Sequence, residues 1–147
     1  MIPSAARCAC RASLKTRSAL PIARLLIVDD DADNRALLEI ILNWEGYVTL
    51  TAESGEEALA VAAEHLPDLM LLDLMMPGLD GFEVITRLKG NLVTQHIPAV
   101  IVSAMHDRAT RERVLSAGAA DFLTKPIERS ELYRCVRSVL LLNAARP

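Results

Sequence analysis

The sequence predicts an α/β fold in which a doubly wound parallel sheet is covered by helices on both faces. Two observations support this prediction. Short apolar runs recur along the chain, and such runs are typical of parallel strands that are buried on both faces. Segments with a helical spacing of apolar residues separate the runs, and this alternation favours right-handed crossovers between parallel strands. The runs are Leu25–Val28, Leu69–Leu72, Ala99–Val102 and Phe122–Thr124.

The composition fits a single soluble domain built from aliphatic side chains. The 147 residues are 52% hydrophobic, 24% charged and 3% aromatic, which is typical of globular α/β proteins rather than of disordered chains. A chain of this length supports one domain with its own core. No apolar stretch approaches the roughly 18 residues that a membrane span needs, so we expect no membrane span.

Charge is distributed unevenly along the chain. The first 24 residues contain five basic residues and no acidic one, although the whole chain has a net charge of −3. The remaining body is therefore acidic, which argues against direct nucleic-acid binding because phosphate contacts need a basic face. We interpret residues 1–22 as a flexible basic leader, with a targeting peptide or an electrostatic arm as alternatives. Because Cys8, Cys10 and Cys135 form no disulfide framework, a reducing cytoplasm is the expected location.

Capping and turn signals predict the elements of the first half. Asp31 or Asp33 can cap a helix that follows the first strand. The apolar residues that recur at helical spacing along this helix are Ala36, Leu37, Ile40, Ile41 and Trp44. Tyr47–Leu50 is predicted to form a short strand. Ser54 has capping-box spacing to a glutamate, so a helix is expected to begin there and to end before Pro67.

The second half contains three further predicted helices. Phe82–Leu88 is a short one that leads into the loop before the fourth strand. Asp107–Ala117 is predicted to be an exposed and lightly anchored helix, because it has few apolar residues. Ser130 is predicted to cap the last helix. The predicted buried stripe of that helix is Leu132, Cys135, Val136, Val139 and Leu140.

Polar residues follow four of the predicted strands, at the point where each strand ends. Asp29 and Asp30 come directly after the first strand, and Asp73 ends the third. Ser103 follows the fourth strand and Lys125 the fifth. The carboxyl ends of parallel strands meet at one edge of the sheet, where α/β proteins bind their ligands. We therefore expect these side chains to converge.

The three carboxylates at this edge predict a metal ion. Two carboxylates about 4 Å apart repel each other by roughly 4 kcal/mol at an effective dielectric constant of about 20. Asp29, Asp30 and Asp73 therefore need a cation if they gather at one place. Oxygen donors with few protein ligands favour Mg²⁺.

This ordered set resembles the receiver domain of two-component response regulators, in particular the stand-alone, chemotaxis-regulator-like type. That family has an acidic pair after the first strand, a phosphoacceptor Asp after the third, Thr or Ser after the fourth, and Lys-Pro after the fifth. The likeness runs from about Arg24 to Asn143, so we place the receiver domain at residues 23–143 and a tail at 144–147. It implies a flavodoxin-like sheet of five parallel strands in the order 2-1-3-4-5.

The resemblance also implies roles for individual residues. The implied catalytic residues are Asp73 as phosphoacceptor, Ser103 and Lys125. The implied Mg²⁺ ligands are Asp29, Asp30, Asp73 and the backbone carbonyl of Met75. The implied switch residues are Ser103 and Phe122. The Lys125–Pro126 bond is similar to the cis peptide of the family.

A phosphorylation-controlled switch is the function that this resemblance implies. A sensor histidine kinase or a histidine phosphotransfer protein would donate the phosphoryl group to Asp73, and the changed surface would bind a downstream target protein. The chain ends soon after its last predicted helix, so we expect a stand-alone receiver rather than a conventional enzyme. Met75 and Met105 are apolar at positions where polar groups can orient a hydrolytic water. We therefore expect self-phosphorylation with slow self-dephosphorylation.

Two alternatives remain open, a phosphorylation-independent interaction module and a receiver fragment of a larger regulator. Other classes that share parts of the pattern fit less well. A phosphatase of the haloacid dehalogenase type needs a second acid two residues after the first, where this chain has Met75. A P-loop hydrolase needs a glycine-rich G-x-x-x-x-G-K-[ST] loop, which the sequence lacks. A flavin phosphate would meet three acids after the first strand.

Overall fold

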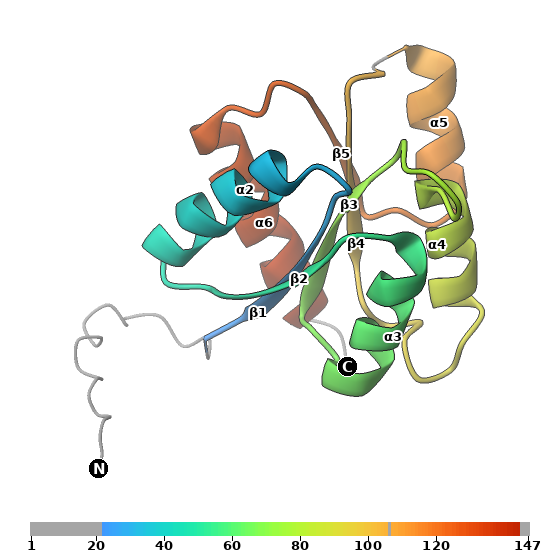
Figure 1. Cartoon of the computed structure of the whole chain (residues 1–147), viewed down its shortest axis with the longest axis horizontal. Helices are drawn as coiled ribbons and strands as arrows, with labels where there is room; N and C mark the ends of the chain where they lie inside the picture. Colours follow the sequence, from blue (N-terminus) through green and yellow to red (C-terminus); the bar gives the residue numbers. More distant parts are fainter. Residues whose placement is uncertain (1–21, 106, 145–147) are drawn as a thin grey trace.

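A single parallel sheet forms the centre of the molecule (Figure 1). The computed structural model describes residues 22–105 and 107–144, and the predicted leader and tail lie outside this range except for Ile22 and Ala144. The five strands found in the described residues are β1 (Arg24–Val28), β2 (Val48–Ala52), β3 (Leu69–Asp73), β4 (Ala99–Ser103) and β5 (Asp121–Thr124). Their order is β2-β1-β3-β4-β5 and all pairs are parallel. The predicted fold class and strand order are therefore confirmed.

Helices cover both faces of this sheet. Those in the described residues are α2 (Ala32–Trp44), α3 (Gly55–His65), α4 (Gly81–Lys89), α5 (Arg108–Ser116) and α6 (Arg129–Ala144). α2 and α6 lie on one face, and α3, α4 and α5 lie on the other (Figure 1). Each strand supplies both cores because its side chains alternate between the faces. Leu25 packs on the α2–α6 side, for example, and Leu26 on the other.

Acidic or hydroxyl side chains cap helices α2 to α5 at their N-termini. Asp31 caps α2 by accepting bonds from the amides of its first turn, and Ser54 Oγ accepts from an amide of α3 at 3.1 Å. Asp107 caps α5, whereas the sequence analysis placed this residue inside the predicted helix. The prediction for Ser130 was wrong, because α6 already begins at Arg129 and Ser130 lies inside its first turn. None of the helices in residues 22–105 and 107–144 combines the length and apolar character that a membrane crossing requires.

Most of the apolar residues whose spacing predicted α2 are not the ones that it buries. Leu38 and Leu42 are its buried residues, whereas Leu37, Ile40 and Trp44 are 56%, 65% and 83% exposed. The helix carries apolar residues at helical spacing on two adjacent stripes, so spacing alone did not decide which stripe meets the sheet.

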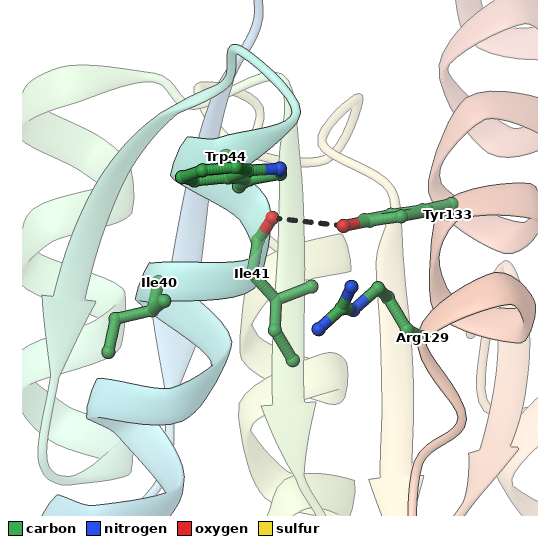
Figure 2. A pocket seen from close by; sticks show the side chains of 5 residues that line it. All are labelled: Ile40, Ile41, Trp44, Arg129 and Tyr133. Carbon is green, nitrogen blue, oxygen red and sulfur yellow. Dashed lines mark hydrogen bonds between the residues drawn. The ribbon is translucent and has the colours of Figure 1, made fainter.

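The exposed stripe of α2 borders a cavity between α2 and α6 (Figure 2). Residues of both helices line this cavity, which has a volume of about 290 Å³, and the Tyr133 hydroxyl donates a hydrogen bond of 3.4 Å to the Ile41 carbonyl across it. The lining residues are Ile40, Ile41, Trp44, Arg129 and Tyr133.

Candidate functional site

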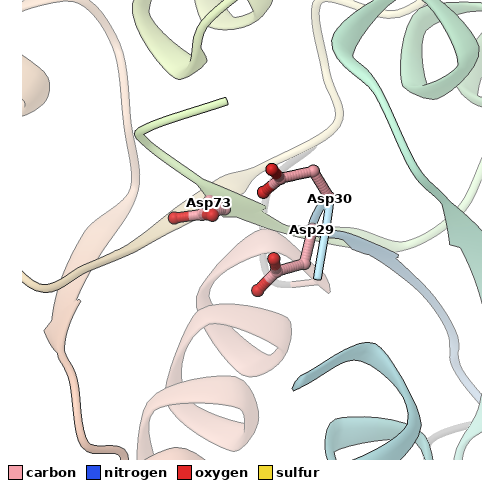
Figure 3. Close-up of side chains that lie close together, drawn as sticks. All are labelled: Asp29, Asp30 and Asp73. Carbon is pink, nitrogen blue, oxygen red and sulfur yellow. The ribbon is translucent and has the colours of Figure 1, made fainter. Parts of the chain in front are cut away.

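Three aspartates from two neighbouring strands meet at the carboxyl edge of the sheet (Figure 3). β1 and β3 pair with Val28 opposite Leu72, so Asp29 and Asp73 leave the sheet side by side. Each of Asp29, Asp30 and Asp73 has a carboxylate oxygen that lies within 4.8 Å of the other two. Asp29 and Asp73 are buried and Asp30 is exposed. The predicted convergence of the acids is therefore present.

Hydrogen bonds to its side chain and to its backbone hold Asp29 in place. Its Oδ1 accepts from the amide of Asp31 at 2.9 Å, and its own amide donates to the carbonyl of Ala52 at 3.2 Å. The guanidinium of Arg35 donates to the Asp29 carbonyl at 2.7 Å. Sequence reasoning missed this contribution of Arg35, for which the only signal was a basic residue one helical turn after the acidic run.

Lys125 reaches the aspartates from the end of β5. Its Nζ lies 3.5 Å from Asp29 Oδ2 and 3.4 Å from Asp73 Oδ1. Its backbone amide donates to the carbonyl of Ser103 at 2.9 Å, and the Lys125–Pro126 bond is cis, as the resemblance implied. The ammonium thus bridges the two buried carboxylates.

The environment of Asp73 disfavours its charged form. Burial raises the pKa of Asp73 most, and the neighbouring charge of Asp29 raises it further. Lys125 acts in the opposite direction, and the pKa is about 6 against an ordinary value of 3.8. The negative charge of the three acids is therefore not fully balanced by Lys125, which is the situation that a bound cation relieves.

Ser103 and Phe122 lie on the same side of the sheet near this edge. Ser103 is buried at the end of β4, opposite Thr124 of β5, and its Oγ accepts from the amide of Met105 at 3.0 Å. Phe122 is two residues before Thr124 and packs in the core on the α3–α5 side. Because side chains on a strand alternate, Phe122 and Thr124 point to the same face.

The turn after β3 brings α4 close to Asp73. Gly78 has a φ of +76°, a conformation that glycine adopts without strain. A Cβ at Gly81 would lie 2.9 Å from Leu74 Cα and 3.1 Å from the Asp73 carbonyl oxygen, so only glycine fits this approach. Asp80 and Glu83 form a capping box that starts α4 here, which the sequence analysis did not foresee. Met75 lies in this turn with an exposed side chain.

A family comparison identifies the chain. The family model described as response regulator receiver domain matches residues 25–137. The chain belongs to this family. The match includes every site residue discussed above. The predicted resemblance is therefore confirmed. Receiver domains of this family take part in two-component signal transduction. Phosphotransfer is the general function of such domains, and their acidic pocket generally holds Mg²⁺.

Relatives and solved structures agree with this assignment. Response regulator PleD from Caulobacter vibrioides is 50% identical over 117 residues, which are 80% of this chain and 26% of PleD. Protein PilH from Pseudomonas aeruginosa is 35% identical over 119 residues, covering 81% of this chain and 98% of PilH. The chain therefore spans about a quarter of PleD but nearly all of PilH.

The fold comparison gives the same family. A putative response regulator from Chloroflexus aurantiacus superimposes with a TM-score of 0.79 at 36% identity, covering 82% of this chain and 99% of that one. The chemotaxis protein CheY4 from Vibrio cholerae gives 0.77 at 27% identity, with coverages of 81% and 99%.

Proposed function

We propose that Asp73 of this receiver domain accepts a phosphoryl group from a sensor histidine kinase or a histidine phosphotransfer protein in the cytoplasm. The phosphorylated domain then signals by contact with a downstream target protein. The observation that carries the proposal is the position of Asp73, a buried carboxylate with Asp29 beside it and the Lys125 ammonium 3.4 Å away. An acid with only a structural role would not be expected beside two further acids, because their carboxylates repel one another.

The chemistry needs a carboxylate nucleophile and groups that stabilise negative charge. An Asp73 oxygen forms the new bond to phosphorus while the bond between phosphorus and the donor histidine nitrogen breaks, and the nitrogen retains the electron pair. The Lys125 ammonium lies where it can stabilise the phosphoryl oxygens. The Ser103 hydroxyl can donate its hydrogen to one of them, because the bond that it accepts from the Met105 amide occupies only a lone pair.

The donor set at this edge fits Mg²⁺. Asp29, Asp30 and Asp73 offer oxygen atoms within 4.8 Å of one another, and the backbone carbonyl of Met75 would add a further oxygen ligand. Such oxygen-only sets with few protein ligands are typical of Mg²⁺ sites, whose remaining positions are filled by water and phosphate. When bound there, the ion offsets the negative charge of the acids and of the incoming phosphoryl group.

The switch in this proposal consists of Ser103 and Phe122. A shift of the buried Ser103 towards a phosphoryl group changes the packing space on the side of the sheet where Phe122 lies. The surface that responds is formed by α5, β5 and α6. Met75 and Met105 present apolar side chains near the site, so the acyl phosphate is expected to hydrolyse slowly.

Labelling with a small phosphodonor tests the proposal. The wild-type domain incubated with phosphoramidate and Mg²⁺ should gain one hydroxylamine-sensitive phosphoryl group by intact mass, and its decay reports the lifetime. Asp73→Asn should gain none. Asp33→Asn, an exposed acid in the first turn of α2, is the matched control and should be labelled normally. Labelling of Asp73→Asn, or none of the wild type, would reject the proposal in favour of a phosphorylation-independent interaction module.

A further inference from the structure

Helix α5 has little apolar contact with the rest of the domain. Within its nine residues, all of which the structure describes, Val114 is the buried side chain. Two arginines add contacts with aromatic rings of neighbouring elements. The Arg113 guanidinium lies 3.9 Å from the centroid of the Phe82 ring on α4, and the Arg111 guanidinium lies 5.5 Å from the centroid of Phe122 on β5. Both distances are in the range of cation–π attraction.

Phe122 is one of the residues that line a cavity next to β5. The side chain is 4% exposed, opposite Ile101 in the register of β4 and β5. The cavity has a volume of about 270 Å³ and opens between β5, α5 and α6. Its lining residues are Arg111, Asp121, Phe122, Leu123, Glu131, Arg134, Cys135 and Ser138.

Hydrogen bonds fix the backbone at Phe122. Its amide donates to Asp121 Oδ1 at 2.7 Å, and the thiol of Cys135 on α6 donates to the other oxygen of the same carboxylate at 3.4 Å. β5 is also paired with β4 along its whole length. A movement at this position therefore has to come from the side chain, and Arg111 is the cation that contacts it.

We propose that Arg111 is a positioning residue that holds the Phe122 ring in its resting place and thereby restrains α5 and the Ser103 end of β4. This inference rests on the proposed function, because the restraint matters only if Phe122 couples to the phosphoryl site. Loss of the Arg111 contact raises the fraction of molecules with a displaced ring. The two ring positions leave different space beside Ser103, so loss of the contact changes the rate of phosphorylation.

The two arginine contacts can be observed separately by fluorine NMR. The chain has two phenylalanines, Phe82 and Phe122, so labelling with 4-fluorophenylalanine places one probe under each guanidinium. Arg111→Ala should shift or broaden the Phe122 resonance and leave that of Phe82 unchanged. Arg113→Ala should do the reverse, and Phe82→Leu assigns the two signals. Arg111→Lys, which keeps a cation, should restore much of the wild-type Phe122 signal.

Phosphorylation rates then connect the contact to the site. With phosphoramidate and Mg²⁺, the labelling rate of Arg111→Ala should differ about two- to five-fold from that of the wild type, the range expected for an exposed cation–π contact. Arg108→Ala is the control on the same helix, because Arg108 pairs with Glu112 at the surface. Its rate and both resonances should be unchanged.

The outcomes separate the two proposals. A wild type that is not labelled rejects the proposed function itself. If the wild type is labelled but Arg111→Ala leaves the Phe122 resonance or the labelling rate unchanged, only the positioning role of Arg111 is rejected. The proposed function then stands.

Discussion

The side chain of Asp73 is subject to electrostatic effects that act in opposite directions. Burial and the charge of Asp29 raise its pKa, the Lys125 ammonium lowers it, and the result is about 6. A carboxylate whose pKa is raised by folding binds its proton more tightly in the folded state than in the unfolded state. Its ionisation therefore opposes folding, and the residue that the proposed chemistry needs is one that reduces the stability of the domain.

We predict that Asp73→Asn stabilises the metal-free domain at neutral pH. Stability linked to Asp73 is fully present below its unfolded pKa near 3.8 and is lost as the pH rises through about 6. The substitution removes this loss, so the free energy of unfolding should increase by about 1–3 kcal/mol at neutral pH and by little near pH 4. Urea unfolding in the presence of a chelator at the two pH values measures the difference.

The exposed Asp33 provides the control for this prediction. Asp33→Asn removes a charge at the same end of the molecule without relieving a buried one, so its effect should be small at both pH values. A variant Asp73→Asn that is less stable than the wild type at neutral pH would show that the contact with Lys125 outweighs the cost of burial.

At the scale of elements, helix α2 shows what periodicity can and cannot predict. Apolar residues at helical spacing correctly predicted a helix after β1, since both of its stripes obey the same period. They did not predict which stripe meets the sheet, because hydrophobicity is similar on the two. The structure places Leu38 and Leu42 against the sheet and leaves Leu37, Ile40 and Trp44 at the surface. Tertiary packing decided between stripes that the sequence left equivalent.

This assignment predicts unequal effects for two similar substitutions on α2. Leu42→Ala removes a side chain that is fully buried in the core between α2, α6 and the sheet, and should cost about 2–5 kcal/mol of unfolding free energy. Ile40→Ala, two residues earlier on the exposed stripe, should change it by about 0.5 kcal/mol or less. Chemical denaturation of the two variants under the same conditions measures both values. Equal losses would mean that the exposed stripe is covered in solution.

The sheet was more predictable than its helices. Four of the five described strands are apolar runs with a polar residue at or just after their end. Both the strand and the position of the site residue could therefore be predicted, as at Asp73 and Ser103. The convergence of Asp29 and Asp73 followed from parallel strand geometry. The contacts that fix the site, such as Arg35 on the Asp29 carbonyl, depend on side-chain conformations that no spacing encodes. The start of α6 was mispredicted because a serine near a helix start fits both a cap and a position in the first turn.

At the scale of the whole molecule, the acidic site joins segments that are far apart in sequence. Asp29 and Asp30 follow β1, Asp73 ends β3 and Lys125 follows β5. These groups are close together only in the folded domain, so a ligand that needs several of them binds the folded state in preference to the unfolded one. Binding of a cation at this site is therefore linked to the stability of the entire fold.

We predict that Mg²⁺ raises the thermal stability of the domain through this linkage. At a free concentration of about 100 times the dissociation constant, the gain should be about 2.7 kcal/mol. Asp30→Asn should weaken the gain and Asp73→Asn should weaken it most, whereas Asp33→Asn should keep it. Protons compete with the cation for Asp73, whose pKa is about 6 without it, so the gain should shrink as the pH falls through this value. Thermal unfolding with and without Mg²⁺ measures these differences, and a gain that is equal in all variants would place the cation elsewhere on the acidic surface.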